Sequence, residues 1–356
     1  MKYDVPFLPD IRYVNFLQEH EQSLYAVHYS LLQADIPDGR HKTFFLDIAT
    51  LNRSLSGLAA VKKYALLNSR FHSPSTYLQP DNTVRILCVL EELLNEDNIN
   101  GIIVVDFYLM QALSDASPEI TSRLEAVPGI NCMLDSMDSI QCYLETIGRS
   151  NFRIPSKLNL DRSLNRRMEE LEEVAAGCCE KYPDILLTLL ANEGCLFRCP
   201  FKFSHDAHIA HANLGCANRT FEMNRSLGCI RILSDRPEEI LRSPFIRPED
   251  QKYYAPFADV LKICGRTLGP DFLIQTISAY IAGTYGGNLL ALLDTQNWQR
   301  DRLILANTDF SRDFLERLTT CGQDCRECGY CKALFDRISR LQPCELRDYR
   351  NPEPAE

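Results

Sequence analysis

Residues 184–200 read DILLTLLANEGCLFRCP, a continuous apolar run that leads directly into a polar loop with two cysteines. An unbroken run of this kind is typical of a strand that is buried on both faces of a parallel sheet. Comparable apolar runs occupy residues 23–28, 43–48, 101–106, 130–134 and 259–263. We therefore expect a parallel sheet, with residues 194–199 on a loop at the end of one strand.

Helical patterns separate these runs. Residues 84–95 have apolar side chains at helical spacing, and residues 164–179 form a longer, charged amphipathic stretch. Strands that alternate with helices indicate repeated βα units, which at this chain length fit one barrel of roughly 250 residues. The predicted fold class is α/β and TIM-barrel-like, with a complete or a distorted barrel. Such barrels place their functional groups on the loops that follow the strands, where residues 194–199 are expected.

The C-terminal part of the chain has a different composition, because five of the 15 cysteines fall between residues 321 and 344. We predict a barrel-like domain over residues 1–305 and a small cysteine-rich module with a tail over residues 306–356.

Composition excludes some classes of function. The chain has a formal net charge of −10, so it gains little from contact with a phosphate backbone, and nucleic-acid binding would need a local basic groove. No stretch reaches the roughly 18 consecutive apolar residues of a membrane-spanning helix. Residues 1–10 lack the pattern of a signal peptide. We expect a cytoplasmic protein with reduced thiols, in which clustered cysteines indicate metal binding rather than disulfides.

The first cysteine group consists of Cys195, Cys199, Cys216 and Cys229, with three, sixteen and twelve residues in the intervals. Four thiolates complete a [4Fe–4S] cluster, and this loose spacing favours a cluster over zinc only weakly, because structural zinc usually takes cysteines from short knuckles. On spacing alone, an iron–sulfur cluster, zinc and no metal all stay open. His205, His208 and His211 lie between these cysteines at intervals of three, so one side of a helix would hold them. They are either functional groups or incidental polar residues.

The second group follows a C-x3-C-x2-C-x2-C pattern through Cys321, Cys325, Cys328 and Cys331, with Cys344 beyond it. Tight spacing of this kind recurs where ferredoxins bind clusters, and it also suits a zinc knuckle. We expect a metal site here, holding a second [4Fe–4S] cluster or zinc.

Several motifs together resemble peptidase family U32, the collagenase-like family. The most specific is LANEGCLFRCPFKFSH at residues 190–205. Others follow in the family's order: SPFIRPED at 243–250, LKICGR at 261–266 and GNLL at 287–290. Asp38-Gly39-Arg40 also lies where the family has a Gly-Arg pair. The resemblance spans roughly residues 20–295.

This resemblance implies a barrel-like α/β fold and a [4Fe–4S] cluster. Several members take part in oxygen-independent hydroxylation of ubiquinone precursors or RNA bases, with prephenate implicated as the oxygen source, while others are described as peptidases. Cys195, Cys199 and Cys216 match the family's cluster cysteines. Cys229 is our choice for the fourth ligand, and Cys264 is the alternative.

Three further residues are candidates for catalysis. Glu193 precedes the first cysteine and is a possible general acid or base, as is His205. Arg266 follows the strand predicted at 259–263, where its planar guanidinium would hold a carboxylate substrate or else form a structural ion pair.

The predicted function is an iron–sulfur enzyme of oxygen-independent hydroxylation, or a related redox modification, of a small molecule or RNA base. One alternative is a peptidase, although no Ser/His/Asp or Cys/His arrangement and no H-E-x-x-H motif is present. Another is a metal-stabilised scaffold subunit that pairs with a related protein in a heterodimer.

Overall fold

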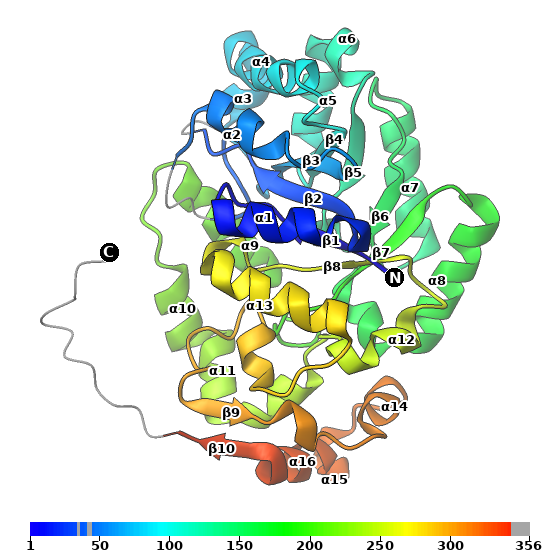
Figure 1. Ribbon diagram of the computed structural model, residues 1–356, viewed down its shortest axis with the longest axis vertical. Helices are drawn as coiled ribbons and strands as arrows, with labels where there is room; N and C mark the ends of the chain where they lie inside the picture. The colour runs from blue at the N-terminus through cyan, green and yellow to red at the C-terminus, as the bar shows by residue number, and fades with distance from the viewer. Residues whose placement is uncertain (34–35, 41–44, 343–356) are drawn as a thin grey trace, which may run out of the picture.

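The computed structural model describes residues 1–33, 36–40 and 45–342 (Figure 1). Eight parallel strands form one sheet in the order β5-β4-β3-β2-β1-β8-β7-β6. They are β1 (Lys2–Pro6), β2 (Leu24–Ser30), β3 (Lys62–Leu67), β4 (Gly101–Val104), β5 (Glu125–Pro128), β6 (Lys157–Asn159), β7 (Leu186–Leu190) and β8 (Val260–Lys262). Because the two outer strands, β5 and β6, are consecutive in the chain, this order is that of a sheet that curls round into a barrel.

The seam between β5 and β6 is joined by isolated contacts rather than by a continuous ladder. Glu125 pairs with Arg153, and Leu134 pairs with Leu160, each as a single parallel bridge. The backbone N–H of Asp161 also donates to the carbonyl oxygen of Leu134 at 2.8 Å. The predicted TIM-barrel-like fold is confirmed, and the barrel is nearly closed.

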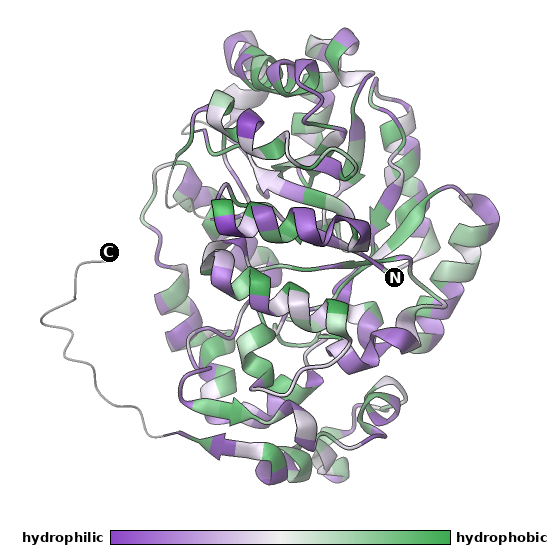
Figure 2. Cartoon of the chain, in the orientation of Figure 1, coloured by the Kyte–Doolittle hydropathy of each residue, from purple (hydrophilic) through white to green (hydrophobic). Residues whose placement is uncertain are grey.

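Helices surround the sheet, and in Figure 2 most show hydrophobic and hydrophilic residues side by side, as expected for helices with one buried face. The α-helices are α1 (Ile11–Glu19), α2 (Ile48–Leu55), α3 (Pro74–Leu78), α4 (Pro80–Asn95), α5 (Phe107–Ala116), α6 (Pro118–Thr121), α7 (Met137–Gly148), α8 (Met168–Lys181), α9 (Lys202–Asn213), α10 (Thr220–Leu227), α11 (Cys229–Asp235), α12 (Gln251–Tyr254), α13 (Gly269–Ala282), α14 (Phe314–Thr319), α15 (Cys325–Cys328) and α16 (Tyr330–Ile338). The 3-10 helices are η1 (Glu21–Ser23), η2 (Ile130–Cys132), η3 (Arg162–Arg166), η4 (Pro237–Arg242), η5 (Pro248–Asp250), η6 (Arg266–Leu268), η7 (Leu289–Leu292) and η8 (Asn307–Asp309).

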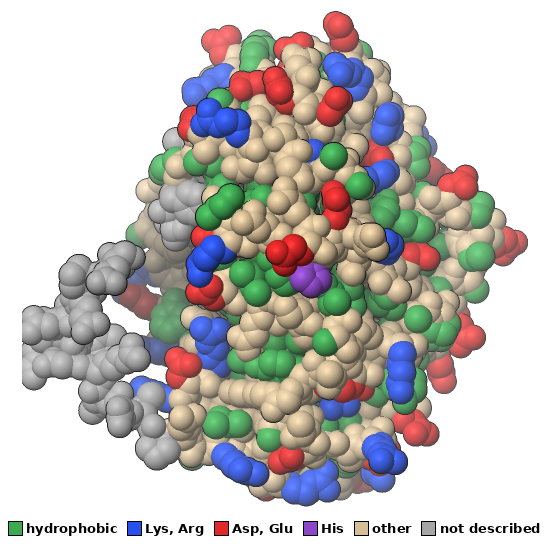
Figure 3. Space-filling model, in the orientation of Figure 1, with side chains coloured by type: hydrophobic (Ala, Val, Ile, Leu, Met, Phe, Trp, Pro, Cys, Tyr) green, Lys and Arg blue, Asp and Glu red, His purple; other side chains and the backbone are tan. Residues whose placement is uncertain are grey.

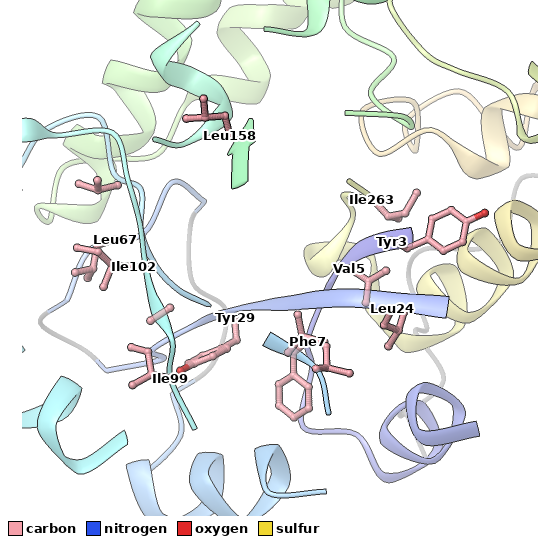
Figure 4. Close-up of a cluster of buried hydrophobic side chains, with 14 of the residues drawn as sticks. Tyr3, Val5, Phe7, Leu24, Tyr29, Leu67, Ile99, Ile102, Leu158 and Ile263 are labelled. Carbon is pink, nitrogen blue, oxygen red and sulfur yellow. The ribbon is translucent and has the colours of Figure 1, made fainter. Parts of the chain in front are cut away.

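The main hydrophobic core lies between the outside of the sheet and these helices. Figure 4 shows part of it, with Val5, Tyr29 and Ile102 projecting from β1, β2 and β4. The opposite face of the sheet contributes a smaller apolar cluster inside the barrel, which consists of Ala26, Tyr64, Leu66, Ile103 and Val127. Alternate residues of each strand thus serve two different packing environments.

Four of the predicted strands are confirmed, since residues 23–28, 101–106, 184–190 and 259–263 correspond to β2, β4, β7 and β8. The helix predicted at 84–95 lies within α4. The helix predicted at 164–179 begins later, at Met168, because the chain first forms η3.

Two strand predictions are wrong. Of residues 43–48, the first two lie outside the described residues; 45–47 form no strand, and α2 begins at Ile48 because the side chain of Asp47 accepts the backbone N–H of Thr50 at 2.8 Å. Residues 130–134 are not a strand, because β5 ends at Pro128 and the chain then turns through η2. Met133 has a φ of 56°, outside the extended region.

The C-terminal part packs against a second, smaller hydrophobic cluster. There β9 (Leu303–Leu305) pairs antiparallel with β10 (Ser339–Leu341). Phe314 and Ile338 of this part share the cluster with Phe245 and Leu290, which come from earlier in the chain. The division of the chain at residue 305 stays a prediction.

The visible face of the molecule in Figure 3 has basic and acidic side chains interspersed over most elements. None of the helices within the described residues combines the length and the apolar character that crossing a membrane requires.

Candidate active site

The loop after β7 contains Asn192, Glu193, Cys195 and Cys199 at the carboxyl ends of the strands, which we call the mouth of the barrel. Asn192 is fully buried and joins this loop to the end of β8. Its Nδ2 donates to the carbonyl oxygen of Cys264 at 2.9 Å, and its Oδ1 accepts the backbone N–H of Cys264 at 2.7 Å. This pair of hydrogen bonds fixes where the cysteine loop begins.

Glu193 forms a buried ion pair with Arg162 of η3. Arg162 is itself oriented by Asn131, whose Oδ1 accepts from Nη2 at 2.7 Å. Burial alone raises the pKa of Glu193, but the charges of Arg162, Lys202 and Arg40 outweigh it, and the pKa lies below its ordinary value. Glu193 is therefore a carboxylate at neutral pH, which suits a general base rather than a general acid.

Two further ion pairs connect loops from opposite parts of the chain. Arg40 pairs with Asp294 at 2.6 Å, and Arg266 pairs with Asp38. The charge of Asp294 raises the pKa of Arg40 despite burial, and Cys264, Glu193 and Cys195 act in the same direction. Arg266 thus has an acidic partner, as expected if its role is an ion pair, and it donates to Asp38 through Nη2.

Three of the four cysteines in the first group lie close enough for their charges to interact. Burial raises the pKa of Cys195 well above its ordinary value, and the neighbouring charges of Glu193 and Cys199 add to that effect. Burial also raises the pKa of Cys229, with Cys199 as the next cause. Arg198, between the two loop cysteines, has a φ of 48°, so the loop makes a left-handed turn there.

Helix α9 brings His205 to the same region. Burial lowers the pKa of His205 to about 4, and the charge of Lys202 adds to this. Lys202 pairs with Asp206 one turn further on, at 2.6 Å. His205 is thus neutral at pH 7 and able to accept a proton, whereas His208 and His211 on the same helix are exposed.

Cys216 lies apart from the other three. It is exposed beyond the end of α9, and its Sγ is 3.2 Å from Nε2 of His211. Within the described residues, no three His, Cys, Asp or Glu side chains are arranged to hold a single metal ion. The alternative ligand Cys264 is half-buried, and burial raises its pKa to about 12, with Asp294 as the next cause.

The interior of the barrel contains a charged cluster that the sequence did not reveal. Asp4 of β1 accepts from Lys157 and, at 3.0 Å, from Lys262, while its other oxygen is 2.8 Å from Nδ1 of His28. Burial, followed by the charge of Lys262, lowers the pKa of His28 to about 3, so the ring is neutral. Burial lowers the pKa of Lys157 to about 8.

The C-terminal cysteines lie outside the barrel, around α15 and α16. Cys325 and Cys328 are exposed, and Cys321 and Cys331 are half-buried. Burial raises the pKa of Cys331 to about 11, and the charges of Cys321 and Cys325 add to it. These thiols therefore lie near one another, as their spacing suggested.

Sequence reasoning missed Arg162, Lys202 and Asp294 as parts of the mouth. Arg162 follows β6, a strand of three residues that leaves no recognisable apolar run. Lys202 lies inside the motif at residues 190–205, so its place near the cysteines could have been predicted from the sequence. Asp294 lies a hundred residues beyond the motif and is brought in only by the fold.

Taken together, these features define the class of protein: an α/β barrel with a cysteine-bearing loop and a buried arginine–carboxylate network at its mouth. No known family model matches the chain. An uncharacterized protease of Methanocaldococcus jannaschii, MJ1657, is 32% identical over 187 residues, which is 52% of this chain and 54% of that protein. The chain therefore matches about half the length of this curated relative.

A solved structure of the U32 peptidase Mk0906 superposes on 74% of this chain and 93% of its own, with a TM-score of 0.48 and 14% identity. The match to the archaeal relative supports the family that the motifs indicated. The chain is similar to peptidase family U32.

Proposed function

We propose that the chain is an iron–sulfur enzyme whose [4Fe–4S] cluster is held at the mouth by Cys195, Cys199 and Cys229, with Cys216 as the fourth ligand. Its reaction would be an oxygen-independent hydroxylation or a related redox modification. The main support is that two thiols of one loop share the barrel mouth with the cationic side chains Arg40, Arg162 and Lys202. Cations at this position stabilise the negative charge of thiolates and of a cluster.

The donor set fits a cluster in its chemistry, because soft thiols on a loop and at the start of a helix are the ligands that iron–sulfur clusters take. Of the four thiols that a cluster needs, Cys195, Cys199 and Cys229 lie close enough for their charges to interact, and Cys216 lies apart. When bound by four thiolates, the cluster would supply one-electron transfer. The side chains of the protein would bind the substrate and move its protons.

Glu193 would accept a proton from the substrate, since its ion pair with Arg162 keeps it ionised and oriented. Neutral His205 would accept a second proton or a hydrogen bond. A substrate carboxylate would bind the guanidinium of Arg266, which has five N–H donors and uses Nη2 to bind Asp38. The proposed substrate is thus a small, carboxylate-bearing molecule, or an RNA base acted on together with one.

Metal analysis of the anaerobically purified full chain tests the cluster. Iron and acid-labile sulfide should be lost in about equal amounts from Cys195→Ala/Cys199→Ala. The Cys229→Ser variant should lose more iron than the Cys264→Ser variant. Cys88→Ser is the matched control, because Cys88 is an exposed thiol on α4. Unchanged iron in the Cys195→Ala/Cys199→Ala chain would contradict the proposal.

Calorimetric titration with prephenate tests the substrate class. We expect binding to the intact chain and at least tenfold weaker binding to Arg266→Met, with Arg300→Met as the control on a surface pair. Equal affinity of all three chains would remove Arg266 from the substrate site.

A peptidase is the second candidate, because the archaeal relative is described as an uncharacterized protease. A broad peptide library incubated with the anaerobic protein distinguishes the two. Cleavage that is lost in Glu193→Gln and persists in Cys195→Ala/Cys199→Ala would favour the peptidase.

A further inference from the structure

A cavity of about 610 Å³ separates the C-terminal cysteine segment from the edge of the barrel. All four thiols of the second group, Cys321, Cys325, Cys328 and Cys331, belong to its wall. Phe197, from the loop between the two mouth cysteines, also lines it, as does Arg166 of η3. The cavity therefore joins the two cysteine groups in space.

Arg166 is a buried cation whose compensation is incomplete: burial lowers its pKa, and the charge of Asp250 and a hydrogen bond with Tyr254 offset only part of that effect. The residue is only 6% exposed, and its guanidinium carbon lies 5.0 Å from the ring centre of Phe245. Across the described ranges, Nε and Nη2 have no hydrogen-bond partner, and no acidic side chain forms an ion pair with this guanidinium. A buried charge of this kind costs several kcal/mol unless an anion lies nearby.

The rest of the wall adds to the positive charge. Arg236 and Arg242 both pair with the single carboxylate of Glu239, at 3.2 and 2.6 Å. Glu238 is also part of this wall, and over the whole lining the cations Arg166, Arg236, Arg242, Arg317 and Lys332 outnumber the acids Glu238, Glu239 and Asp324. The cavity thus offers thiol ligands together with a cationic wall, which suits an occupant with negative charge.

We propose that this cavity holds an iron–sulfur cluster bound by Cys321, Cys325, Cys328 and Cys331, and that Arg166 stabilises the negative charge of the cluster with its thiolates. Zinc is the rival occupant, because four thiolates also complete a structural zinc site, and the metal analysis below separates the two. The proposal does not depend on the cluster at the mouth.

Cysteines from the C-terminal segment and from the mouth pack against a common hydrophobic cluster. Cys199 and Cys229 of the first group pack against the same small apolar cluster as Tyr330 and Cys331. Thiols of both groups thus border the same apolar cluster.

Metal analysis of the full chain, purified and reconstituted anaerobically, tests the ligands. In a Cys195→Ala/Cys199→Ala background we expect iron and acid-labile sulfide in about equal amounts, and loss of both when Cys325→Ser/Cys328→Ser is added. Cys142→Ser, an exposed thiol on α7, is the matched control and should change nothing. Retention of iron after the added substitutions, or one zinc per chain in its place, overturns the proposal.

A spectroscopic readout keeps the test decisive if the quadruple variant folds poorly. The dithionite-reduced Cys195→Ala/Cys199→Ala chain should give the electron paramagnetic resonance signal of a reduced cluster. A chain that is folded by circular dichroism, contains its C-terminal cysteines and gives no such signal contradicts the proposal.

Arg166→Gln tests the role of the buried cation. Removing a positive charge beside the cluster should make its reduction potential more negative while the iron content is retained, because net charge helps to set cluster potentials. Arg236→Gln, at the exposed rim, should shift the potential less. An unchanged potential in Arg166→Gln would assign this arginine a purely structural role.

Discussion

The barrel mouth and the C-terminal cysteine segment use charge in opposite ways. At the mouth, buried cations each have a buried acidic partner, as in Arg162 with Glu193, and the thiols among them are half-buried. In the C-terminal segment the ion pairs are exposed, as in Lys332 with Asp336, and Arg166 on the neighbouring wall has no acidic partner among the described residues. Each cation of the mouth thus has a carboxylate beside it as well as the nearby thiols, whereas the cavity beside the C-terminal segment is lined by more cations than carboxylates.

The largest difference is expected when one member of each kind of ion pair is removed. Glu193→Ala leaves the guanidinium of Arg162 buried without its partner and should lower the free energy of unfolding by about 3–5 kcal/mol. Asp336→Ala breaks an exposed pair, with both side chains more than half exposed, and should change it by less than about 0.5 kcal/mol. Urea unfolding followed by far-ultraviolet circular dichroism measures both.

A double variant serves as the control for the mouth. Arg162→Met/Glu193→Ala removes both charges and should recover part of the lost stability, because no unpaired charge is left behind. A double variant as unstable as the sum of its single variants would show that packing, and not charge, dominates this site.

The buried charges of the barrel predict a pH dependence that the exposed C-terminal pairs cannot give. His28 has a folded pKa of about 3, below its unfolded value of 6.5, so between these values the unfolded chain binds more protons. Stability is therefore full above pH 6.5 and falls as the pH decreases. The loss between pH 6.5 and 5 should be about 2 kcal/mol from this residue.

His205 titrates in the same sense, with a folded pKa of about 4, and must be separated from His28. His205→Asn should remove its share of the slope and leave the share of His28. Asp4 contributes at lower pH, because its folded pKa lies below the ordinary value and its stabilisation is lost only as the pH falls below about 4. A stability that is constant from pH 6.5 to 5 in His205→Asn would contradict a neutral, buried His28.

Thiol modification compares the two cysteine groups directly. In the metal-free chain at pH 8, Cys325 and Cys328 are exposed and should react with iodoacetamide at least tenfold faster than Cys195, whose pKa burial raises well above its ordinary value. Cys264, with a pKa of about 12, should be slow as well. Peptide mass spectrometry of a time course gives each rate, and a fast Cys195 would mean that the mouth opens in solution.

The same contrast explains what the sequence could and could not predict. The strand at 184–190 was recognisable because it is apolar throughout, and the cysteine loop because its motif is specific. β1 and β6 were not, because the buried Asp4 and Lys157 interrupt the apolar pattern that marks a strand. Arg162 follows the unrecognised β6, and its partner Glu193 comes from the loop after β7. Charges that compensate one another only in three dimensions leave no periodic signal.

The smallest effect on stability should come from Cys216, the predicted ligand that stands apart from both regions. It is exposed beyond α9 and touches His211, so Cys216→Ser should change the free energy of unfolding of the metal-free chain by less than about 0.5 kcal/mol, like Cys88→Ser. If Cys216 completes the mouth cluster, the same substitution should lower the iron content and Cys88→Ser should not. Small stability changes with equal iron content in both variants would remove Cys216 from the ligand set and leave the fourth position to another residue. Because the exposed site tolerates serine, a loss of iron in Cys216→Ser with unchanged stability would identify a ligand rather than a packed thiol.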